Sequence, residues 1–226
     1  MDNEEQSGKK KLIILLIVLI AVTIVLVVLN KKMDTNNKVL GAQDYVIEKE
    51  TEYSKDESKG PLPVINLKGK EIEKINNEIL GIYYSIAYKE YDVFKYEFNL
   101  HNNILSLLIT VTLVDDTESG TIKYYSYNIN VKDNKRLSNK EVVKELKLDS
   151  NIIDEKLEFR IKKYYSLDVL NKTMSYEEYK ELINYKKEEA KIYIKDKKLY
   201  AYIALGLTQG LLEYPGNINE ILISEL

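Results

Sequence analysis

The hydrophobic and polar positions divide this chain into one long apolar run and a patterned remainder. Residues 12–29 read LIILLIVLIAVTIVLVVL and contain no charged residue and no proline. A helix of this length would be roughly 27 Å long, close to the apolar thickness of a bilayer, and would satisfy its own backbone hydrogen bonds. We therefore predict a transmembrane anchor over residues 12–30, preceded by a cytoplasmic tail of residues 1–11.

A cleaved signal peptide is the competing interpretation of this run. Its apolar region would typically be roughly 7–15 residues long, with small residues at a cleavage site shortly afterwards. Here the run is longer, and Asn30, Lys31 and Lys32 follow it directly, which favours an uncleaved signal-anchor. Lysines flank the run on both sides, and most of the chain follows it. We expect the short tail in the cytoplasm and the C-terminal part outside the cell membrane.

Residues 31–60 are polar and rich in Lys, Asp, Glu, Asn and Ser. This composition is typical of a flexible stalk. Within it, residues 44–53 alternate weakly between apolar and charged positions, which predicts an edge strand. The apolar positions of that strand are Tyr45, Ile47 and Tyr53.

Pro61 and Pro63 favour extended backbone at the start of a folded domain, which we place at residues 61–226. Residues 69–89 follow, and their apolar side chains recur every three or four positions, the spacing of one helix face. These side chains are Ile72, Ile75, Ile79, Ile82, Tyr83 and Ile86. We predict a helix that packs through this face on the next segments of the chain.

Three segments of alternating polarity come next, at residues 93–100, 104–114 and 121–131. Alternate side chains of a strand lie on one face of a sheet, so each segment predicts a strand of an antiparallel meander. The middle segment is apolar on much of both faces, which is typical of a central strand. The predicted core of helix and sheet comprises Ile72, Ile75, Ile79, Phe98, Leu107, Ile109 and Val111.

Near residue 135 the period of the apolar positions changes, and this is the one place where the domain could subdivide. Ser138 with Glu141, and Ser175 with Glu178, have the spacing of capping boxes and each predict the start of a helix. A helical stripe between them is formed by Ile153, Leu157, Ile161 and Tyr164.

Three further strands are predicted near the end of the chain, at residues 192–194, 199–205 and 218–223. The complete order is a transmembrane helix, a helix, a three-strand meander, two to three helices and three strands. This order defines an α+β domain in which the first of the domain's helices packs on antiparallel sheet.

Charge and composition narrow the possible functions. The net charge is −3, and residues 1–32 carry five lysines against three acids, so the remaining residues carry −5. Nucleic acid is therefore not an expected partner, because its binding domains present a basic face. An AT-rich coding bias explains the 19 tyrosines, although tyrosine also suits sugar- or protein-binding surfaces.

Residues that could carry catalysis are scarce. His101 is the only histidine and cysteine is absent, so a structural zinc site lacks ligands. His101 lies in a predicted turn beside Asn102, which favours a solvated turn residue over a member of a catalytic triad. Asp115, Asp116 and Glu118 lack the spacing of an EF-hand loop, which favours an acidic hairpin tip over a cation site. We predict no catalytic, cofactor-binding or metal-binding residue and no cofactor, and the sequence does not identify the residues of a binding site.

Three motifs extend over about residues 61–148. LPVINLKGKEIEKINNEI contains P-x-I-N followed by I-N-x-x-I, NNILSLLITVTL contains n-x-n-I-L-S-L, and YNINVKDNKRLSNKEV forms a turn into a helix. They are carried by Pro63, Ile65, Asn66, Ile75, Asn76, Ile79, Asn102, Ile104, Leu105, Ser106, Leu107, Asn128, Val131, Lys135, Leu137 and Ser138. In these motifs the chain resembles an extracytoplasmic domain-of-unknown-function family of Gram-positive bacteria. That family occurs in the lysozyme-sensing anti-sigma factor RsiV and in the N-terminal region of the peptidoglycan deacetylase PdaC.

The resemblance implies a noncatalytic, membrane-tethered binding or sensing module that faces the cell wall. We do not expect a cytoplasmic sigma-binding domain, because residues 1–11 are too few to form one. We also do not expect a deacetylase domain, whose metal ligands the sequence does not supply. Residues 211–216 lack the Y-A-x-G loop of the family, so its lysozyme contacts are not transferred to this chain.

These observations predict a single-pass protein of the cell envelope with its C-terminal domain outside. Its expected partners are the membrane and either a cell-wall component or a lysozyme-like protein. The alternative is an enzyme or accessory domain that acts on peptidoglycan, although no pair among the 36 acidic residues is singled out for that chemistry. A purely structural envelope protein without a ligand is the third possibility.

Overall fold

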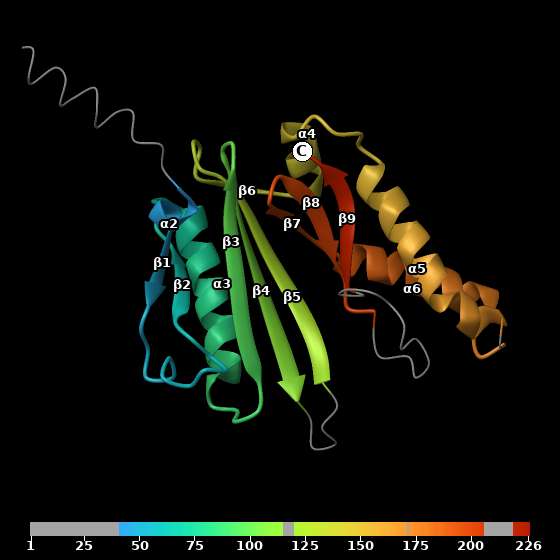
Figure 1. Cartoon of the computed structure of the whole chain (residues 1–226), viewed down its shortest axis with the longest axis horizontal. Coiled ribbons are helices and arrows are strands. Elements are labelled where there is room, and N and C mark those ends of the chain that lie inside the picture. The colour runs from blue at the N-terminus through green and yellow to red at the C-terminus, as the bar shows by residue number, and fades with distance from the viewer. Residues whose placement is uncertain (1–40, 115–119, 171, 206–218) are drawn as a thin grey trace, which may run out of the picture. The chain divides into compact units, whose positions relative to one another are not determined.

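The structure is a computed structural model that describes residues 41–114, 120–170, 172–205 and 219–226. Residues 41–226 form one compact unit of helices and antiparallel sheets (Figure 1), which confirms the predicted α+β class. Within the described ranges, no helix is both long and apolar enough to cross a bilayer. The predicted anchor at residues 12–30 lies outside those ranges.

The first large sheet has the strand order β3-β4-β5-β6 and is antiparallel throughout. Its strands are Val93–His101 for β3, Ile104–Val114 for β4, Gly120–Asn130 for β5 and Lys135–Leu137 for β6. The first three confirm the predicted meander. The sequence does not predict β6, because three residues are too few to establish a period. Asn102 lies in the turn between β3 and β4 with a φ of 54°, a left-handed conformation that asparagine tolerates.

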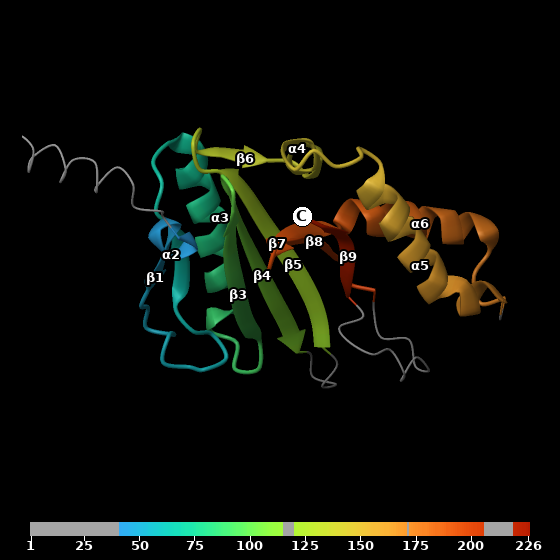
Figure 2. The ribbon, with the colours of Figure 1, turned by 45° about the horizontal axis from the view of Figure 1, so that its top comes forward.

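Helix α3 (Lys70–Ala87) packs on one face of this sheet (Figure 2). The predicted helix face is buried, and Ile79 in its middle is 0% exposed. Six of the seven predicted core residues are fully buried, whereas Phe98 is half-buried at the margin of the same cluster. Alternate side chains of β3, β4 and β5 complete this core, namely Phe94, Leu105, Leu107, Ile109, Val111, Tyr127 and Ile129.

The N-terminal part of the unit is a small two-stranded sheet beside α3. It comprises α2 (Ala42–Tyr45), β1 (Val46–Lys49) and β2 (Leu62–Ile65), and β1 pairs antiparallel with β2. The prediction of a flexible stalk is therefore wrong for residues 41–60, which belong to the folded unit. The predicted edge strand exists with the opposite phase, since Val46 is buried in the α3 core and Ile47 is exposed.

Hydrogen bonds hold residues 51–60 against α3, and a polar composition does not reveal them. The Tyr83 hydroxyl donates to the carbonyl oxygen of Gly60 at 2.9 Å and lies 2.7 Å from the hydroxyl of Thr51. The ammonium group of Lys59, a residue only 1% exposed, donates to the carbonyl oxygens of Lys89 and Asp92. These contacts order a segment that has few apolar side chains.

Three helices and a second large sheet form the C-terminal part. The helices are α4 (Asn139–Glu145), α5 (Ile152–Leu170) and α6 (Tyr176–Glu189), and the strands are β7 (Lys191–Lys195), β8 (Lys198–Tyr202) and β9 (Glu220–Glu225). Both predicted capping boxes are present, at Ser138 for α4 and at Ser175 for α6. The predicted stripe of α5 is buried against one face of the β7-β8-β9 sheet. The predicted helices and terminal strands are therefore present, although β8 ends at Tyr202 instead of residue 205 and β9 covers Glu220–Glu225 instead of residues 218–223.

The opposite face of the β7-β8-β9 sheet packs on the first large sheet, a contact that the sequence does not predict. Leu108 and Tyr124 from the first sheet meet Tyr193 and Tyr202 from the second. The side-chain amide of Asn128 donates to the carbonyl oxygen of Ile192 at 3.0 Å. This contact explains why β4 is apolar on both faces. The strand order β3-β4-β5-β6 confirms β4 as a central strand.

Candidate functional site

Of the four residues that were considered above for catalysis or metal binding, the structure describes only His101. His101 ends β3 opposite Ile104, and no described hydrogen bond joins it to a serine or a carboxylate. Asp115, Asp116 and Glu118 lie outside the described residues. Across the described ranges, no group of three or more His, Cys, Asp or Glu side chains is placed to hold a metal ion.

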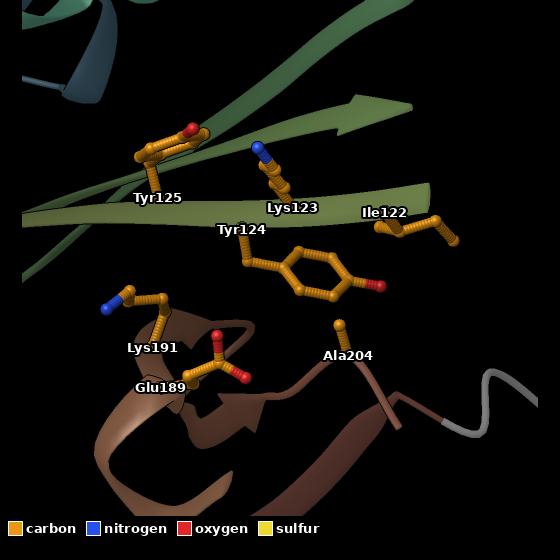
Figure 3. Close-up of a pocket in the computed structure, with 7 residues that line it drawn as sticks. All are labelled: Ile122, Lys123, Tyr124, Tyr125, Glu189, Lys191 and Ala204. Carbon is orange, nitrogen blue, oxygen red and sulfur yellow. The ribbon is translucent and has the colours of Figure 1, made fainter. Parts of the chain in front are cut away.

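A pocket opens instead between β5 and the junction of α6 with β7 (Figure 3). It encloses about 250 Å³. Its lining consists of Ile122, Lys123, Tyr124, Tyr125, Glu189, Lys191 and Ala204. The pocket therefore lies beside the contact between the two large sheets, and parts of the chain more than sixty positions apart contribute to it.

Strand alternation places the aromatic wall of this pocket. Tyr125 packs with the α3 core on one face of β5, so its neighbour Tyr124 projects from the other face. Figure 3 shows the Tyr124 ring extending toward Ala204, with Glu189 on the same side of β5. The Tyr124 and Tyr202 rings pack with centroids 5.3 Å apart, which fixes the aromatic wall against the second sheet.

Charged groups from the end of α6 and the start of β7 form the opposite wall. The carboxylate of Glu189 accepts a hydrogen bond from the Tyr185 hydroxyl at 2.6 Å, and the Lys186 ammonium lies 3.3 Å from it. The hydrogen bond to Glu189 raises the pKa of Tyr185. Lys191 lines the pocket two residues further on, and no ion pair involving it is found among the described residues. The lining thus carries two ammonium groups, those of Lys123 and Lys191, and one carboxylate, which also pairs with Lys186.

Two buried tyrosines, Tyr193 and Tyr202, lie behind the pocket. Burial, followed by the hydrogen bond to Glu220, raises the pKa of Tyr202, and its hydroxyl lies 2.6 Å from that carboxylate. Burial likewise raises the pKa of Tyr193. Both phenols remain protonated at neutral pH, so they can donate hydrogen bonds but cannot serve as general bases there.

The pocket is therefore suited to binding a small polar ligand. Its described lining offers no activated nucleophile. A volume near 250 Å³ is slightly below the roughly 300–1,000 Å³ that is typical of small-molecule sites. It suits a single sugar ring or one amino-acid-sized group. The tyrosine wall supplies apolar contact, and the ammonium and carboxylate groups supply the complement of a zwitterion.

Sequence reasoning missed this site because no local motif encodes it. The excess of tyrosine was the only available signal, and coding bias explained it equally well. No family model and no curated protein matches this chain. Fold and pocket therefore define its class: an α+β protein with two antiparallel sheets in contact and an aromatic, charged pocket beside that contact.

Proposed function

We propose that this protein is a membrane-anchored, extracytoplasmic binding or sensing module of the bacterial cell envelope. The observation that carries the binding function is the pocket of Figure 3, in which Tyr124 projects from β5 to the side where Glu189 and Lys191 lie. Its ligand class is a component of the cell wall that presents amino and carboxylate groups beside a sugar ring. Such a group matches the pocket in size and in charge.

The proposed location is supported by the pattern of residues 12–29, which carry no charge and have the length of one bilayer span. The lysines on both sides of the run are consistent with an uncleaved anchor. The motifs within residues 61–148 support the same setting, because they resemble an extracytoplasmic family. On this proposal the folded unit faces the wall.

A noncatalytic role is supported by the chemistry of the pocket lining. Nucleophilic catalysis requires a base within hydrogen-bond reach of the nucleophile, and hydrolysis of sugars requires two opposed carboxylates. The lining contains a single carboxylate, Glu189, which already accepts a hydrogen bond from Tyr185. The lining is therefore suited to holding a ligand.

Calorimetric titration of the full-length chain in detergent micelles tests this proposal, with a disaccharide-tetrapeptide fragment of peptidoglycan as the ligand. We expect binding with a Kd of about 10 μM, which Lys191→Ala weakens about tenfold, or about 1.4 kcal/mol. Lys132→Ala, a change at an exposed lysine outside the pocket, serves as the control and leaves the Kd unchanged. Absence of binding, equal effects of the two variants, or cleavage of the fragment would each contradict the proposal.

A further inference from the structure

Strand β9 forms one edge of the second large sheet. The strand order is β7-β8-β9, and β9 pairs with β8 on one side only. On its other side, no described strand pairs with it. Alternate N–H and C=O groups of an edge strand point away from the sheet and can template a further strand. Figures 1 and 2 both show β9 between β8 and α5.

A groove of about 250 Å³ runs between this edge and helix α5. Its lining consists of Lys156, Phe159, Arg160, Lys163, Glu220, Ile221 and Leu222. The α5 members recur at helical spacing and lie next to the buried stripe of the same helix. The groove therefore has a helix along one side and strand backbone along the other.

Apolar side chains remain exposed on both sides of the groove. Phe159 is 70% exposed and Leu222 is 44% exposed, so both are available for contact. Phe159 projects from α5, and Leu222 projects from the face of β9 opposite to the buried Ile221 and Ile223, so a ligand at this edge meets one apolar side chain on each of its faces. The β9 backbone between them gives it hydrogen-bonding groups.

The charge of the groove is predominantly positive. Lys156, Arg160 and Lys163 line it from α5, whereas Glu220 is the only acid in the lining. The carboxylate of Glu220 already lies in hydrogen-bond contact with the Tyr202 hydroxyl. An acidic ligand therefore complements this groove better than a neutral or basic one.

We propose that this groove binds an extended acidic peptide, which adds to β9 as a further antiparallel or parallel strand. The spacing supports this occupant, because alternate residues of a strand lie about 6.6 Å apart and Lys156 and Arg160 are separated by about 6 Å along the helix. Acidic side chains at alternate positions of the peptide thus face α5, where Lys156 and Phe159 are exposed. The intervening side chains lie on the other face of the added strand, the face from which Leu222 projects, and the peptide backbone pairs with β9.

This inference concerns a site separate from the pocket of Figure 3 and does not depend on the location of the protein. Arg160 and Lys163 also have partners elsewhere in the chain, so the test relies on Lys156 and Phe159. Both side chains are exposed, and changing them leaves the buried stripe of α5 intact. Tyr91, which is also 70% exposed, provides a matched aromatic control.

The test is fluorescence anisotropy of a labelled decapeptide that alternates Glu and Val, titrated with the full-length chain in detergent micelles. We expect saturable binding that Lys156→Glu and Phe159→Ala each weaken at least tenfold, while Tyr91→Ala changes it less than twofold. Replacing every Glu of the peptide by Lys, or N-methylating its alternate amides on the β9 side, abolishes binding. Amide hydrogen exchange of β9 slows when the Glu-Val peptide is bound.

Three results would overturn this inference. Equal binding of the N-methylated peptide would exclude strand addition, and equal binding of the Lys-Val peptide would exclude charge recognition. Sedimentation of the chain alone as a dimer that Phe159→Ala dissociates would show that a second copy of the chain occupies this edge. Failure of the peptide to bind at any concentration up to 1 mM (about −4 kcal/mol) would remove the site altogether.

Discussion

Glu141 closes the N-terminus of α4 through hydrogen bonds from two directions. Its carboxylate accepts from the backbone N–H of Ser138 at 2.8 Å, and the Lys135 ammonium lies 2.8 Å from its other oxygen. The hydrogen bond from Lys135, followed by those from Ser138, lowers the pKa of Glu141 from 4.5 to about 2. Folding therefore favours the ionised form of this side chain.

The consequence for stability follows from the direction of that shift. A carboxyl whose pKa falls on folding stabilises the protein at pH values above its pKa in the unfolded state. This stabilisation is lost as the pH falls from the unfolded-state pKa toward the folded-state pKa. Glu141→Gln should therefore flatten the decline of stability between pH 4.5 and about 2. Urea unfolding at several pH values measures this slope, with Glu188→Gln, an exposed site on α6, as the control. An unchanged slope in Glu141→Gln would contradict the capping role.

At the scale of single residues, the sequence predicts contacts between residues a few positions apart, but not contacts between distant residues. The capping serines are recognisable because their partners lie three positions away. Lys59 shows the opposite case: its burial depends on carbonyl groups about thirty residues further along the chain, at Lys89 and Asp92. A lysine in a polar segment reads as exposed from sequence, since burial of this residue type is rare.

At the scale of elements, α3 is the helix on which the first sheet depends. Ile79 is 0% exposed, whereas its neighbour Leu80 is 38% exposed on the other side of the helix. Ile79→Ala should cost about 2–5 kcal/mol in the free energy of unfolding, because it removes a large buried side chain and leaves a cavity. Leu80→Ala is the matched control and should cost clearly less. Chemical denaturation measures both, and similar losses would show that the helix does not use the face described.

Long elements with a clear period were predicted with accurate bounds, whereas several of the shortest strands were missed or predicted with the wrong phase. Helix α3 and strands β3, β4 and β5 each span several repeats of their apolar pattern, so the sequence places them within one or two residues. Strands β2 and β6 have four and three residues, which is too short for a period to be recognised, and the four-residue strand β1 was predicted with the opposite phase. Their places depend on pairing with partners that a local pattern does not identify.

At the scale of the whole molecule, the two large sheets are in contact, and both proposed binding sites lie on the second sheet or beside it. The sequence indicated from its two apolar faces that β4 is a central strand, but it did not predict the sheet carrying Tyr193 and Tyr202 that covers the second face. None of the pocket residues was predicted, because β5 and the α6–β7 junction meet only in the folded chain. The composition shows that tyrosine is abundant, but only the fold shows which tyrosines lie together.

The proposed function requires the folded unit to lie outside the cell membrane, and cysteine labelling tests this requirement most directly. The chain has no cysteine, so a single introduced cysteine is an unambiguous reporter. Lys144→Cys places it on the exposed surface of the folded unit, and Ser7→Cys places it in the N-terminal tail. Both full-length variants are expressed in Gram-positive cells, which are then converted to protoplasts and treated with a membrane-impermeant maleimide. We expect labelling of Lys144→Cys in intact protoplasts and labelling of Ser7→Cys only after permeabilisation. Protection of Lys144→Cys in intact protoplasts would contradict the proposed location outside the membrane.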